Sequence, residues 1–209
     1  MGLWARARGR FNAWGLAALD GYLHRKFAAR KQRLLHDVPP VAVELGSGSG
    51  TNFRYLPRGL RLVAVEPNVQ AHGLLKRRAE RYGLVLELHA EFAEHLALPS
   101  DSVEFVFCSL VLCSVRDPSA VIAEVRRVLK PGGRFVCLEH VAAEPHSRLA
   151  RWQRLVRRPW HWAFDGCDVC RDTGALLRAG GFSRVDVTPF TLQTFAWPIR
   201  PIIEAVCVK

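Results

Sequence analysis

The stretch Glu44-Leu45-Gly46-Ser47-Gly48-Ser49-Gly50 decides the fold class of this 209-residue chain. It overlaps the apolar run 41–45, so the pattern predicts a buried strand that leads directly into a loop with three glycines. Glycine adopts backbone conformations with positive φ and lets a ligand approach the main chain closely. The spacing differs from the G-x-G-x-x-G pattern of dinucleotide-binding folds, and no Lys-Ser or Lys-Thr pair completes a P-loop. The loop therefore predicts a nucleotide-like ligand at the carboxyl end of this strand.

Glu66 supplies the second part of the predicted site. It ends the next predicted strand, 60–65, and lies twenty residues after Gly46. In dinucleotide-binding folds an acid at the end of the second strand accepts hydrogen bonds from ribose hydroxyls. The loop and the acid together predict a site for an adenosyl group. In the alternative interpretation, 46–50 is only a tight turn and Glu66 is a solvated strand end.

Segments of strand and helix character alternate along the chain. Strands are predicted at 41–45, 60–65, 84–88, 103–112, 134–138, 184–188 and 205–208, and helices at 69–82, after Asp117-Pro118 and at 172–179. Pro131-Gly132-Gly133 is predicted to end the second of these helices. The alternation predicts an α/β fold with a doubly wound, mostly parallel seven-stranded sheet. We expect one domain at 37–209, preceded by a helical extension at 1–36.

The segment 1–36 carries most of the excess positive charge. The chain has a formal net charge of +11, and this segment holds eight Lys or Arg residues against the single acid Asp20. Its apolar residues recur at helical spacing, which predicts a basic amphipathic helix that contacts an anionic membrane surface. A solvated surface helix and a lid over the donor pocket are alternatives. No apolar run reaches the roughly 18–20 residues of a membrane span, and basic residues interrupt any signal peptide, so we expect a cytoplasmic protein with at most peripheral membrane contact.

The six cysteines predict neither a disulfide framework nor a metal site. Four of them lie in or beside predicted buried strands, where a free thiol behaves as a small apolar residue. Cys167 and Cys170 form a lone C-x-x-C pair without a second pair of ligands. We therefore expect ordinary free thiols and no bound metal.

Residues 140–170 interrupt the alternation and combine aromatic with basic side chains. The aromatic residues are Trp152, Trp160, Trp162 and Phe164, and five arginines lie among them. We interpret this stretch as an insertion over the carboxyl ends of the strands, forming a lid or the wall of an acceptor pocket. Simple packing of an inserted helix onto the core is the alternative.

The pattern E-x-G-x-G-x-G followed by a strand-ending acid resembles motif I and its partner in class I S-adenosylmethionine-dependent methyltransferases. The stretch 129–133, LKPGG, is similar to the turn before the fifth strand of those enzymes. The resemblance implies a Rossmann-like fold and S-adenosylmethionine as cofactor, released as S-adenosylhomocysteine. The residues that it places at the cofactor are Glu44, Gly46, Ser47, Gly48, Gly50, Asn52, Glu66, Pro67, Asn68, Phe92, Ala93, Glu94, Cys108 and Leu110.

The resemblance also implies roles within this set. The glycines 46, 48 and 50 would line the methionine and ribose part, Glu66 would hold the ribose, and Pro67-Asn68 would flank the adenine. Family members often have D-A-E-x-L-P before the fourth strand, whereas this chain has FAEHLA at 92–97. Phe92 replaces the aspartate, so we expect the adenine to rest against its ring or to meet backbone groups.

Four further stretches resemble the membrane-associated alkyl thiol S-methyltransferases of animals. They are 108–115 (CSLVLCSV), 138–144 (LEHVAAE), 164–167 (FDGC) and 205–209 (AVCVK). This resemblance implies a small lipophilic thiol as acceptor. Those proteins carry a hydrophobic N-terminal anchor, whereas the segment 1–36 is basic and amphipathic here.

His140 and Asp165 are the predicted catalytic residues. Methyl transfer from a sulfonium chiefly requires alignment of donor and acceptor, because the leaving group is very good. His140 follows the fifth predicted strand and would face the acceptor as a base or as a cationic neighbour of a thiolate. A structural histidine bonded to backbone is the alternative.

Other acceptors and a non-enzymatic function are alternatives to a thiol. N-methylation of a phospholipid headgroup or another amphiphile is favoured by the basic segments, and C-methylation of a quinone-like ring is a further option. A nucleic-acid acceptor is disfavoured, because the chain lacks the N/D-P-P-Y/F signature and a recognisable RNA-binding module. The non-enzymatic alternative is a membrane-associated protein that binds S-adenosylmethionine without turnover. We expect a monomer.

Overall fold

The computed structural model describes residues 20–164 and 166–209. The chain divides into two compact units, Met1–Phe92 and Ala93–Lys209. Residues 1–19 of the predicted amphipathic extension and the predicted catalytic residue Asp165 lie outside the described residues. No helix of the described residues is long and apolar enough to cross a membrane.

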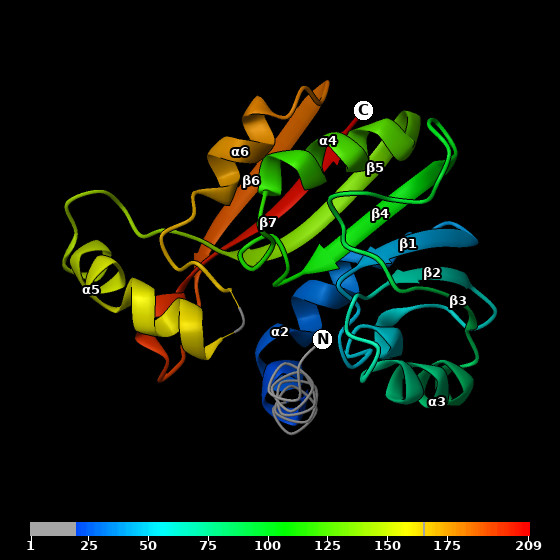
Figure 1. Cartoon of the computed structure of the whole chain (residues 1–209), viewed down its shortest axis with the longest axis horizontal. Helices are drawn as coiled ribbons and strands as arrows, with labels where there is room; N and C mark the ends of the chain where they lie inside the picture. The colour runs from blue at the N-terminus through cyan, green and yellow to red at the C-terminus, as the bar shows by residue number, and fades with distance from the viewer. Residues whose placement is uncertain (1–19, 165) are drawn as a thin grey trace. The chain divides into compact units, whose positions relative to one another are not determined.

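Among its described residues, the first unit contains three parallel strands and two α-helices (Figure 1). Its strand order is β3-β2-β1. Its elements are α2 (Asp20–Leu34), β1 (Val41–Leu45), the 3-10 helix η1 (Phe53–Tyr55), β2 (Arg61–Val65), α3 (His72–Tyr82) and β3 (Val85–His89). In β1 and β2 every residue after the first is buried, as expected for strands covered on both faces.

Helix α2 is anchored to the rest of the first unit. Its buried residues are Phe27 and Lys31. Asp20, at its first position, forms ion pairs with Arg54 and with Arg78, the latter at 3.0 Å. The described part of the predicted N-terminal extension therefore packs against the segment that follows the glycine loop, and it is not a free surface helix.

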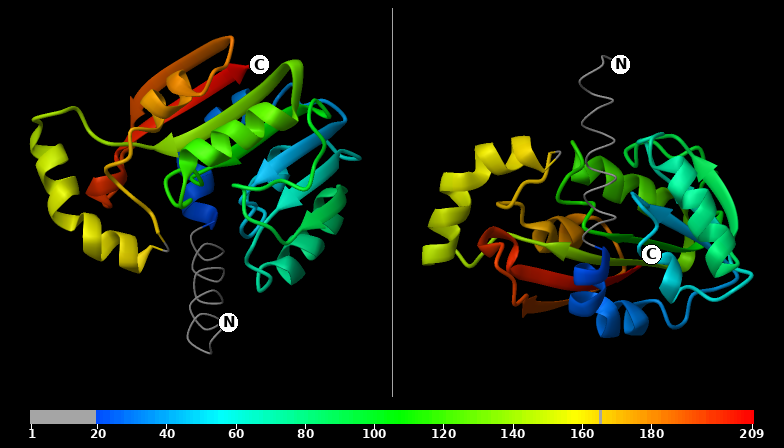
Figure 2. Two further views of the ribbon diagram at one scale, coloured as in Figure 1. Left: turned by 45° about the horizontal axis from the view of Figure 1, so that its top comes forward. Right: turned by 90° about the horizontal axis from the view of Figure 1, so that it is seen from below.

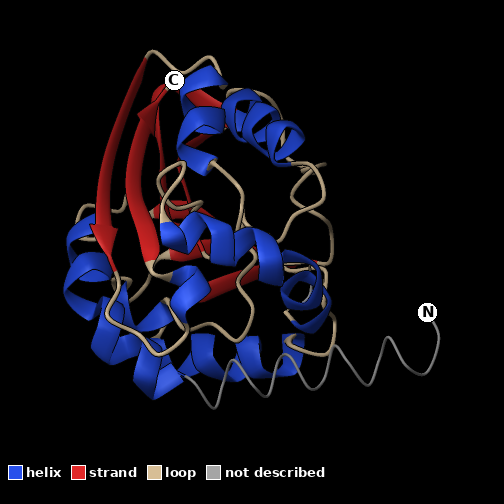
Figure 3. Cartoon of the chain, turned by 90° about the vertical axis from the view of Figure 1, so that its left-hand side faces the viewer, coloured by secondary structure: helices blue, strands red, loops and turns tan. Residues whose placement is uncertain are grey.

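The second unit contains a four-stranded part of the sheet in the order β4-β5-β7-β6. Strand β4 pairs with β5 in parallel, whereas β7 pairs with both β5 and β6 in antiparallel fashion. The opposed arrows of β6 and β7 are visible in Figure 3. The elements are β4 (Val103–Ser109), α4 (Pro118–Val128), β5 (Leu129–His140), α5 (Arg148–Ala163), α6 (Thr173–Ala179), β6 (Arg184–Thr191), the 3-10 helix η2 (Trp197–Ile199) and β7 (Pro201–Val208). The predicted α/β fold with a mostly parallel seven-stranded sheet is confirmed.

Helix α4 begins as predicted but ends earlier. The Asp117 carboxylate caps it by accepting from the backbone N–H groups of Ser119 and Ala120, at 2.9 and 3.1 Å. The helix ends at Val128, because the following residue is already extended. The prediction that 131–133 ends this helix is wrong: 129–133 belongs to β5, and the register shift opposite 103–105 absorbs its extra residues as a bulge.

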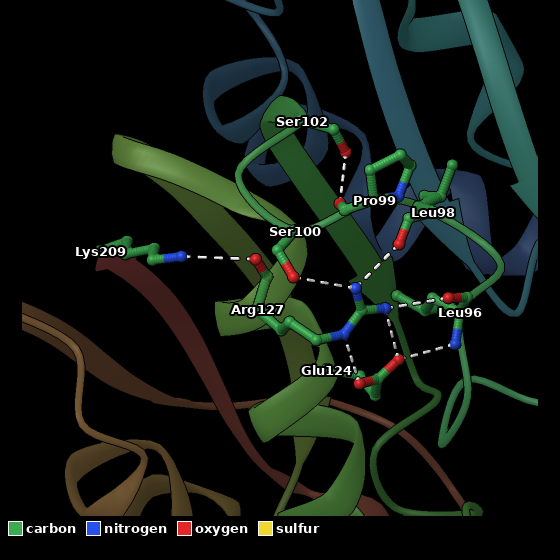
Figure 4. A network of polar contacts seen from close by, with 8 residues as sticks. All are labelled: Leu96, Leu98, Pro99, Ser100, Ser102, Glu124, Arg127 and Lys209. Carbon is green, nitrogen blue, oxygen red and sulfur yellow. Dashed lines mark hydrogen bonds and ion pairs between the residues drawn. The ribbon is translucent and has the colours of Figure 1, made fainter.

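Arg127 fastens the segment before β4 to helix α4 (Figure 4). Its guanidinium donates to the carbonyl oxygens of Leu96 and Leu98, at 2.9 and 2.8 Å, and to both carboxylate oxygens of Glu124. Glu124 in turn accepts from the Leu96 N–H at 2.8 Å. This network lowers the pKa of Glu124, with the Arg127 hydrogen bond as the main cause. The hydrogen bonds of Arg127 and Glu124 hold the irregular segment 96–98 against helix α4.

Helix α5 forms most of the predicted insertion at 140–170. Ser147 caps it by accepting from the Ala150 N–H at 3.0 Å. The helix lies beyond the carboxyl end of β5 and packs against η2 (Figures 1 and 2). The insertion therefore stands at the end of the strand that carries His140, which is where an acceptor-side wall was predicted.

Candidate functional site

The glycine loop has the backbone conformation that its sequence requires. Gly46, Gly48 and Gly50 have φ values of +59°, +54° and +74°, in the left-handed region that favours glycine. The Gly46 N–H donates to the Val65 carbonyl at 2.8 Å, which joins the start of the loop to the end of β2. At Gly50 a side chain would also meet the ring of Phe53 at 3.1 Å. The loop therefore lies at the carboxyl ends of β1 and β2, with Gly46 and Gly48 half-buried and the other three residues buried.

Glu66 is bonded directly to this loop. One of its carboxylate oxygens accepts from the Gly48 N–H at 2.7 Å, and the other accepts from the Asn68 N–H at 2.8 Å. The side chain of Glu66 is nearly buried, with 7% of the residue exposed. Pro67, between Glu66 and Asn68 in sequence, is half-buried. The structure thus brings together the loop, the acid and the Pro67-Asn68 pair, all of which were predicted from the sequence.

A buried polar chain lies behind the glycine loop. Lys31 Nζ donates to Asn52 Oδ1 at 2.6 Å, and Asn52 Nδ2 donates to Glu44 Oε1 at 2.7 Å. Burial lowers the pKa of Lys31 to about 8 and raises the pKa of Glu44. Asn52 and Glu44 were predicted cofactor residues, whereas Lys31 was not. A lysine on a basic helix carries no sequence signal that separates it from its solvated neighbours.

Buried polar atoms that lack a partner in the described part of the chain lie in and next to the glycine loop. Glu44 Oε2 and Ser49 Oγ are buried, and neither has a hydrogen-bond partner among the described residues. Buried polar atoms without partners are costly, so a ligand that supplies donors such as an ammonium group would be favoured there. Together with the left-handed glycines and Glu66, these atoms could hold a ligand that carries both an ammonium group and hydroxyls.

The remaining predicted cofactor residues lie on both sides of the boundary between the units. Phe92 ends the first unit with 56% of the residue exposed, and Ala93 is buried. Glu94 accepts from the backbone N–H of Arg116 at 3.0 Å and of Asp117 at 3.4 Å. Its carboxylate therefore stabilises the turn before α4.

Cys108 lies near the end of β4 and Leu110 directly follows the strand, next to a buried acid that was not predicted as a site residue. Glu139, fully buried in β5, accepts from the N–H groups of Val111 and Leu112 at 2.8 and 3.1 Å and from the Cys108 thiol at 3.4 Å. Leu110 has φ +60°, a conformation that a leucine adopts only where its surroundings impose it. An acid inside the apolar strand sequence VCLEH was the available signal, because a buried carboxylate needs several donors.

His140 contacts thiols. Its Nε2 lies 3.0 Å from Sγ of Cys167, which also accepts from the indole N–H of Trp160 at 3.0 Å. Contact with Cys113 and, next to it, His140 lowers the pKa of Cys167 to about 5, and contact with Cys167 raises the pKa of Cys113. The predicted alternative of a histidine bonded to backbone does not describe this arrangement. The partner segments are remote in sequence, so no local pattern could have revealed it.

The segment that carries Cys167 is fastened to the loop after β4. The Asp168 N–H donates to the Cys113 carbonyl at 2.8 Å, and Arg171 donates to the Leu112 carbonyl at 2.5 Å. Arg157 donates to both carboxylate oxygens of Asp168, at 3.0 and 2.7 Å. These bonds fix the two cysteines relative to each other.

Known proteins that are similar to this chain in sequence are methyltransferases. The methyltransferase domain family matches residues 43–137. Thiol S-methyltransferase TMT1A of Homo sapiens is 32% identical over 220 residues, which cover 100% of this chain and 90% of that protein. The chain belongs to the thiol S-methyltransferase family. It is therefore an S-adenosylmethionine-dependent methyltransferase, and the predicted enzyme class, cofactor and resemblance are confirmed.

Solved structures share the fold of this family member. A SAM-dependent methyltransferase of Thermotoga maritima superposes with a TM-score of 0.66 at 18% identity, covering 96% of this chain and 98% of the other. Geranyl diphosphate C-methyltransferase of Streptomyces coelicolor, solved with S-adenosyl-L-homocysteine, gives a TM-score of 0.68 at 15% identity, covering 89% and 80%. At these identities the likeness establishes the Rossmann-like fold.

Proposed function

We propose that this methyltransferase transfers the methyl group of S-adenosylmethionine to the sulfur of a small lipophilic thiol. The observation that carries the donor half is the bond between Gly48 and Glu66, which makes the loop and the acid one preformed site. The acceptor half is supported by the relatives named thiol S-methyltransferases, which align with the whole chain. Val156 and Trp160 of α5 pack against the cluster of Cys113, Cys167 and Val169 beside the end of β5, which supports a lipophilic acceptor.

The donor would be held by residues of the glycine loop and its surroundings. The loop 46–50 would line the methionine and ribose part, and Glu66 would accept from the ribose hydroxyls. Glu44 Oε2 would accept from the methionine ammonium group, because it is buried without a partner among the described residues. Asn52 orients this carboxylate, and Lys31 orients Asn52. The other predicted contacts of the cofactor remain proposals: Ser47, Pro67, Asn68, Phe92, Ala93, Glu94, Cys108 and Leu110.

The reaction is an in-line displacement. S-adenosylmethionine supplies an activated methyl group; the acceptor sulfur forms a bond to that carbon, and the electron pair of the broken bond returns to the donor sulfur. The acceptor's thiol proton passes to solvent. The chain contributes alignment and exclusion of water, which can lower the barrier by about 7–11 kcal/mol. A thiol with a reference pKa of about 8.5 is partly ionised at neutral pH, so modest assistance is enough. We propose that His140 lies on the acceptor side and provides it.

Contact with an anionic membrane surface is part of this proposal, and to the predicted contact through 1–36, of which 1–19 lie outside the described residues, we add helix α5. Helix α5 exposes an apolar stripe of Trp152, Leu155 and Trp162, which are 51%, 70% and 77% exposed. Their spacing places them on one face of the helix, and Arg151 and Arg158 flank that face. Aromatic residues beside arginines suit a helix that lies in the headgroup region. The enzyme would then bind a lipophilic acceptor at the membrane in which that acceptor dissolves.

A labelled-donor assay tests the function. Purified protein and S-adenosylmethionine with a labelled methyl group are incubated separately with alkyl thiols, phosphatidylethanolamine vesicles, a quinol and RNA. We expect transfer to the thiols, with Glu66→Gln strongly reduced. Transfer to phosphatidylethanolamine, quinol or RNA without transfer to any thiol would contradict the proposed acceptor. Binding of the donor without turnover on any of them would favour a non-enzymatic function.

Vesicle sedimentation tests the membrane contact. We expect the protein to sediment with anionic vesicles more than with neutral ones, and the double variant Leu155→Ser/Trp162→Ser to lose most of this binding. Val85→Ser is the matched control, because Val85 is also an exposed apolar residue but lies on β3. Equal sedimentation of the double variant and the control would exclude α5 as the contact.

A further inference from the structure

Three side chains that ligate soft metal ions converge in the second unit. Cys113 follows β4, His140 is the last residue of β5, and Cys167 follows α5. Their ligand atoms all lie within 4.8 Å of one another, and all three residues are buried. The cluster shares His140 with the proposed reaction and adds two thiols, Cys113 and Cys167, that the reaction does not use; as a metal ligand His140 would assist the acceptor through the ion and not as a base. We expected no metal from the sequence, where Cys167 and Cys170 form a lone C-x-x-C pair and the three cluster residues are far apart along the chain.

The spacing of the three atoms suits one zinc ion. Zinc binds cysteine sulfur at about 2.3 Å and histidine nitrogen at about 2.0–2.1 Å, so ligand atoms of a tetrahedral site are about 3.6–3.8 Å apart. His140 Nε2 lies 3.0 Å from Cys167 Sγ, and no pair of the three is more than 4.8 Å apart. Entry of an ion would need ligand shifts on the order of 1 Å.

The chemistry of the ligand set favours zinc over a hard cation. Thiolate and imidazole are ligands for soft and borderline metal ions, whereas Mg²⁺ and Ca²⁺ take oxygen ligands. Two thiolates and a neutral imidazole balance the charge of Zn²⁺, which is important in a buried site where a net charge is costly. The two thiol protons would pass to solvent on binding.

The surroundings orient the ligands as an outer shell does in metal sites. Trp160 donates to the sulfur of Cys167, and Asp168 donates to the carbonyl of Cys113. Val156, Val169 and Ile199 pack around the two cysteines and form an apolar shell. Such hydrogen bonds and apolar shells fix ligand orientation and exclude water. Nδ1 of His140 is buried and has no hydrogen-bond partner among the described residues, so this nitrogen is available for one further hydrogen bond or for a metal ion.

We propose that Cys113, His140 and Cys167 bind one Zn²⁺ ion and that the fourth position of the ion takes the sulfur of the acceptor thiol. Three protein ligands leave the open position that distinguishes catalytic zinc sites from structural ones. The acceptor thiol would bind as a thiolate, with its proton passing to solvent, and the negative charge that it adds to the complex would be removed when its sulfur takes the methyl group from the sulfonium. The second part rests on the thiol acceptor proposed above, whereas the metal site itself does not.

Metal binding is measured without turnover. The reduced, metal-free full chain is titrated with Zn²⁺ against a chromophoric chelator and, separately, with Co²⁺. We expect one equivalent of each ion and a sulfur-to-cobalt charge-transfer band that grows when an alkyl thiol is added. Cys113→Ser and Cys167→Ser should bind Zn²⁺ at least about 100-fold more weakly, since even loss of an outer-shell partner weakens binding about 10–100-fold. Trp160→Phe, which retains all three ligands, should bind about 10-fold more weakly.

Cys170→Ser is the matched control, because Cys170 is a neighbouring cysteine outside the cluster. It should bind Zn²⁺ like wild type. Binding of less than one equivalent by wild type, loss of binding in Cys170→Ser, or a Cys113–Cys167 disulfide in the protein as purified would overturn the site. A cobalt spectrum that does not change with thiol would overturn the fourth ligand only. Zinc binding without any thiol methylation would instead contradict the proposed function and leave the metal site standing.

Discussion

Replacing Glu139 by glutamine should destabilise the second unit although the two side chains have the same shape. The Glu139 carboxylate accepts from the N–H groups of Val111 and Leu112 through one oxygen and lies 3.4 Å from the N–H of Cys113 through the other. An amide keeps one acceptor oxygen but turns two hydrogen bonds to a charged group into neutral ones, at about 1 kcal/mol each. Its NH₂ group then faces the third N–H, which leaves a buried donor unsatisfied at about 1–3 kcal/mol. Removal of a buried charge offsets part of this, so we expect a loss of about 2–4 kcal/mol.

The assay is equilibrium unfolding in urea, together with the affinity for S-adenosylhomocysteine. Both should fall in Glu139→Gln, because the loop that it holds carries Leu110, a proposed cofactor contact. Glu104→Gln is the matched control: Glu104 lies on the neighbouring strand β4 and pairs with Lys130 at the surface, so it should behave like wild type. If Glu139→Gln unfolds at the same urea concentration as Glu104→Gln, the assignment of Glu139 as the organiser of this loop is wrong.

Three further changes test separate parts of the account. As the pH rises from about 8 to 10.5, wild type should gain stability relative to Lys31→Met, on the order of 3 kcal/mol. The reason is that the unfolded state keeps the Lys31 proton to higher pH than the folded state does. Parallel pH profiles of the two proteins in urea unfolding would contradict this. Gly50→Ala should lose about 1–3 kcal/mol and cofactor affinity, since a side chain at φ +74° would crowd Phe53; an unchanged melting temperature would count against it. Arg127→Met should lose about 2 kcal/mol at neutral pH, and the difference should shrink as acid protonates Glu124, whose pKa is lowered in the folded state; a difference independent of pH would refute this coupling.

The strands and the donor loop were predictable because their signals are local. A short apolar run predicts a buried strand, and the three glycines of the loop 46–50 predict its backbone conformation. Glu66 follows from the spacing of two successive strands in one type of fold. Asp117 before Pro118 marked the start of α4 for the same reason, since a cap and its helix are neighbours in sequence.

The remaining features depend on contacts between distant segments. Lys31 reaches Asn52 only after α2 has packed on the first unit, and the three residues of the cysteine–histidine cluster lie on separate elements. The order of the last strands, with β7 between β5 and β6, brings 201–208 against 134–140 in a way that no periodicity indicates. The bulge at 129–133 depends on the pairing of β5 with β4, whereas proline and glycine alone suggested a turn.

The most direct test of the donor site is calorimetric titration of the purified chain with S-adenosylhomocysteine. We expect binding of one molecule per chain, and an affinity about 10–100-fold lower in Glu66→Gln, because a buried carboxylate that accepts from ribose hydroxyls contributes about 1.5–3 kcal/mol. Glu87→Gln, an exposed acid on β3, should bind like wild type. Absence of binding by folded wild type, or equal affinities in the two variants, would contradict the claim that the loop 46–50 and Glu66 hold the adenosyl group.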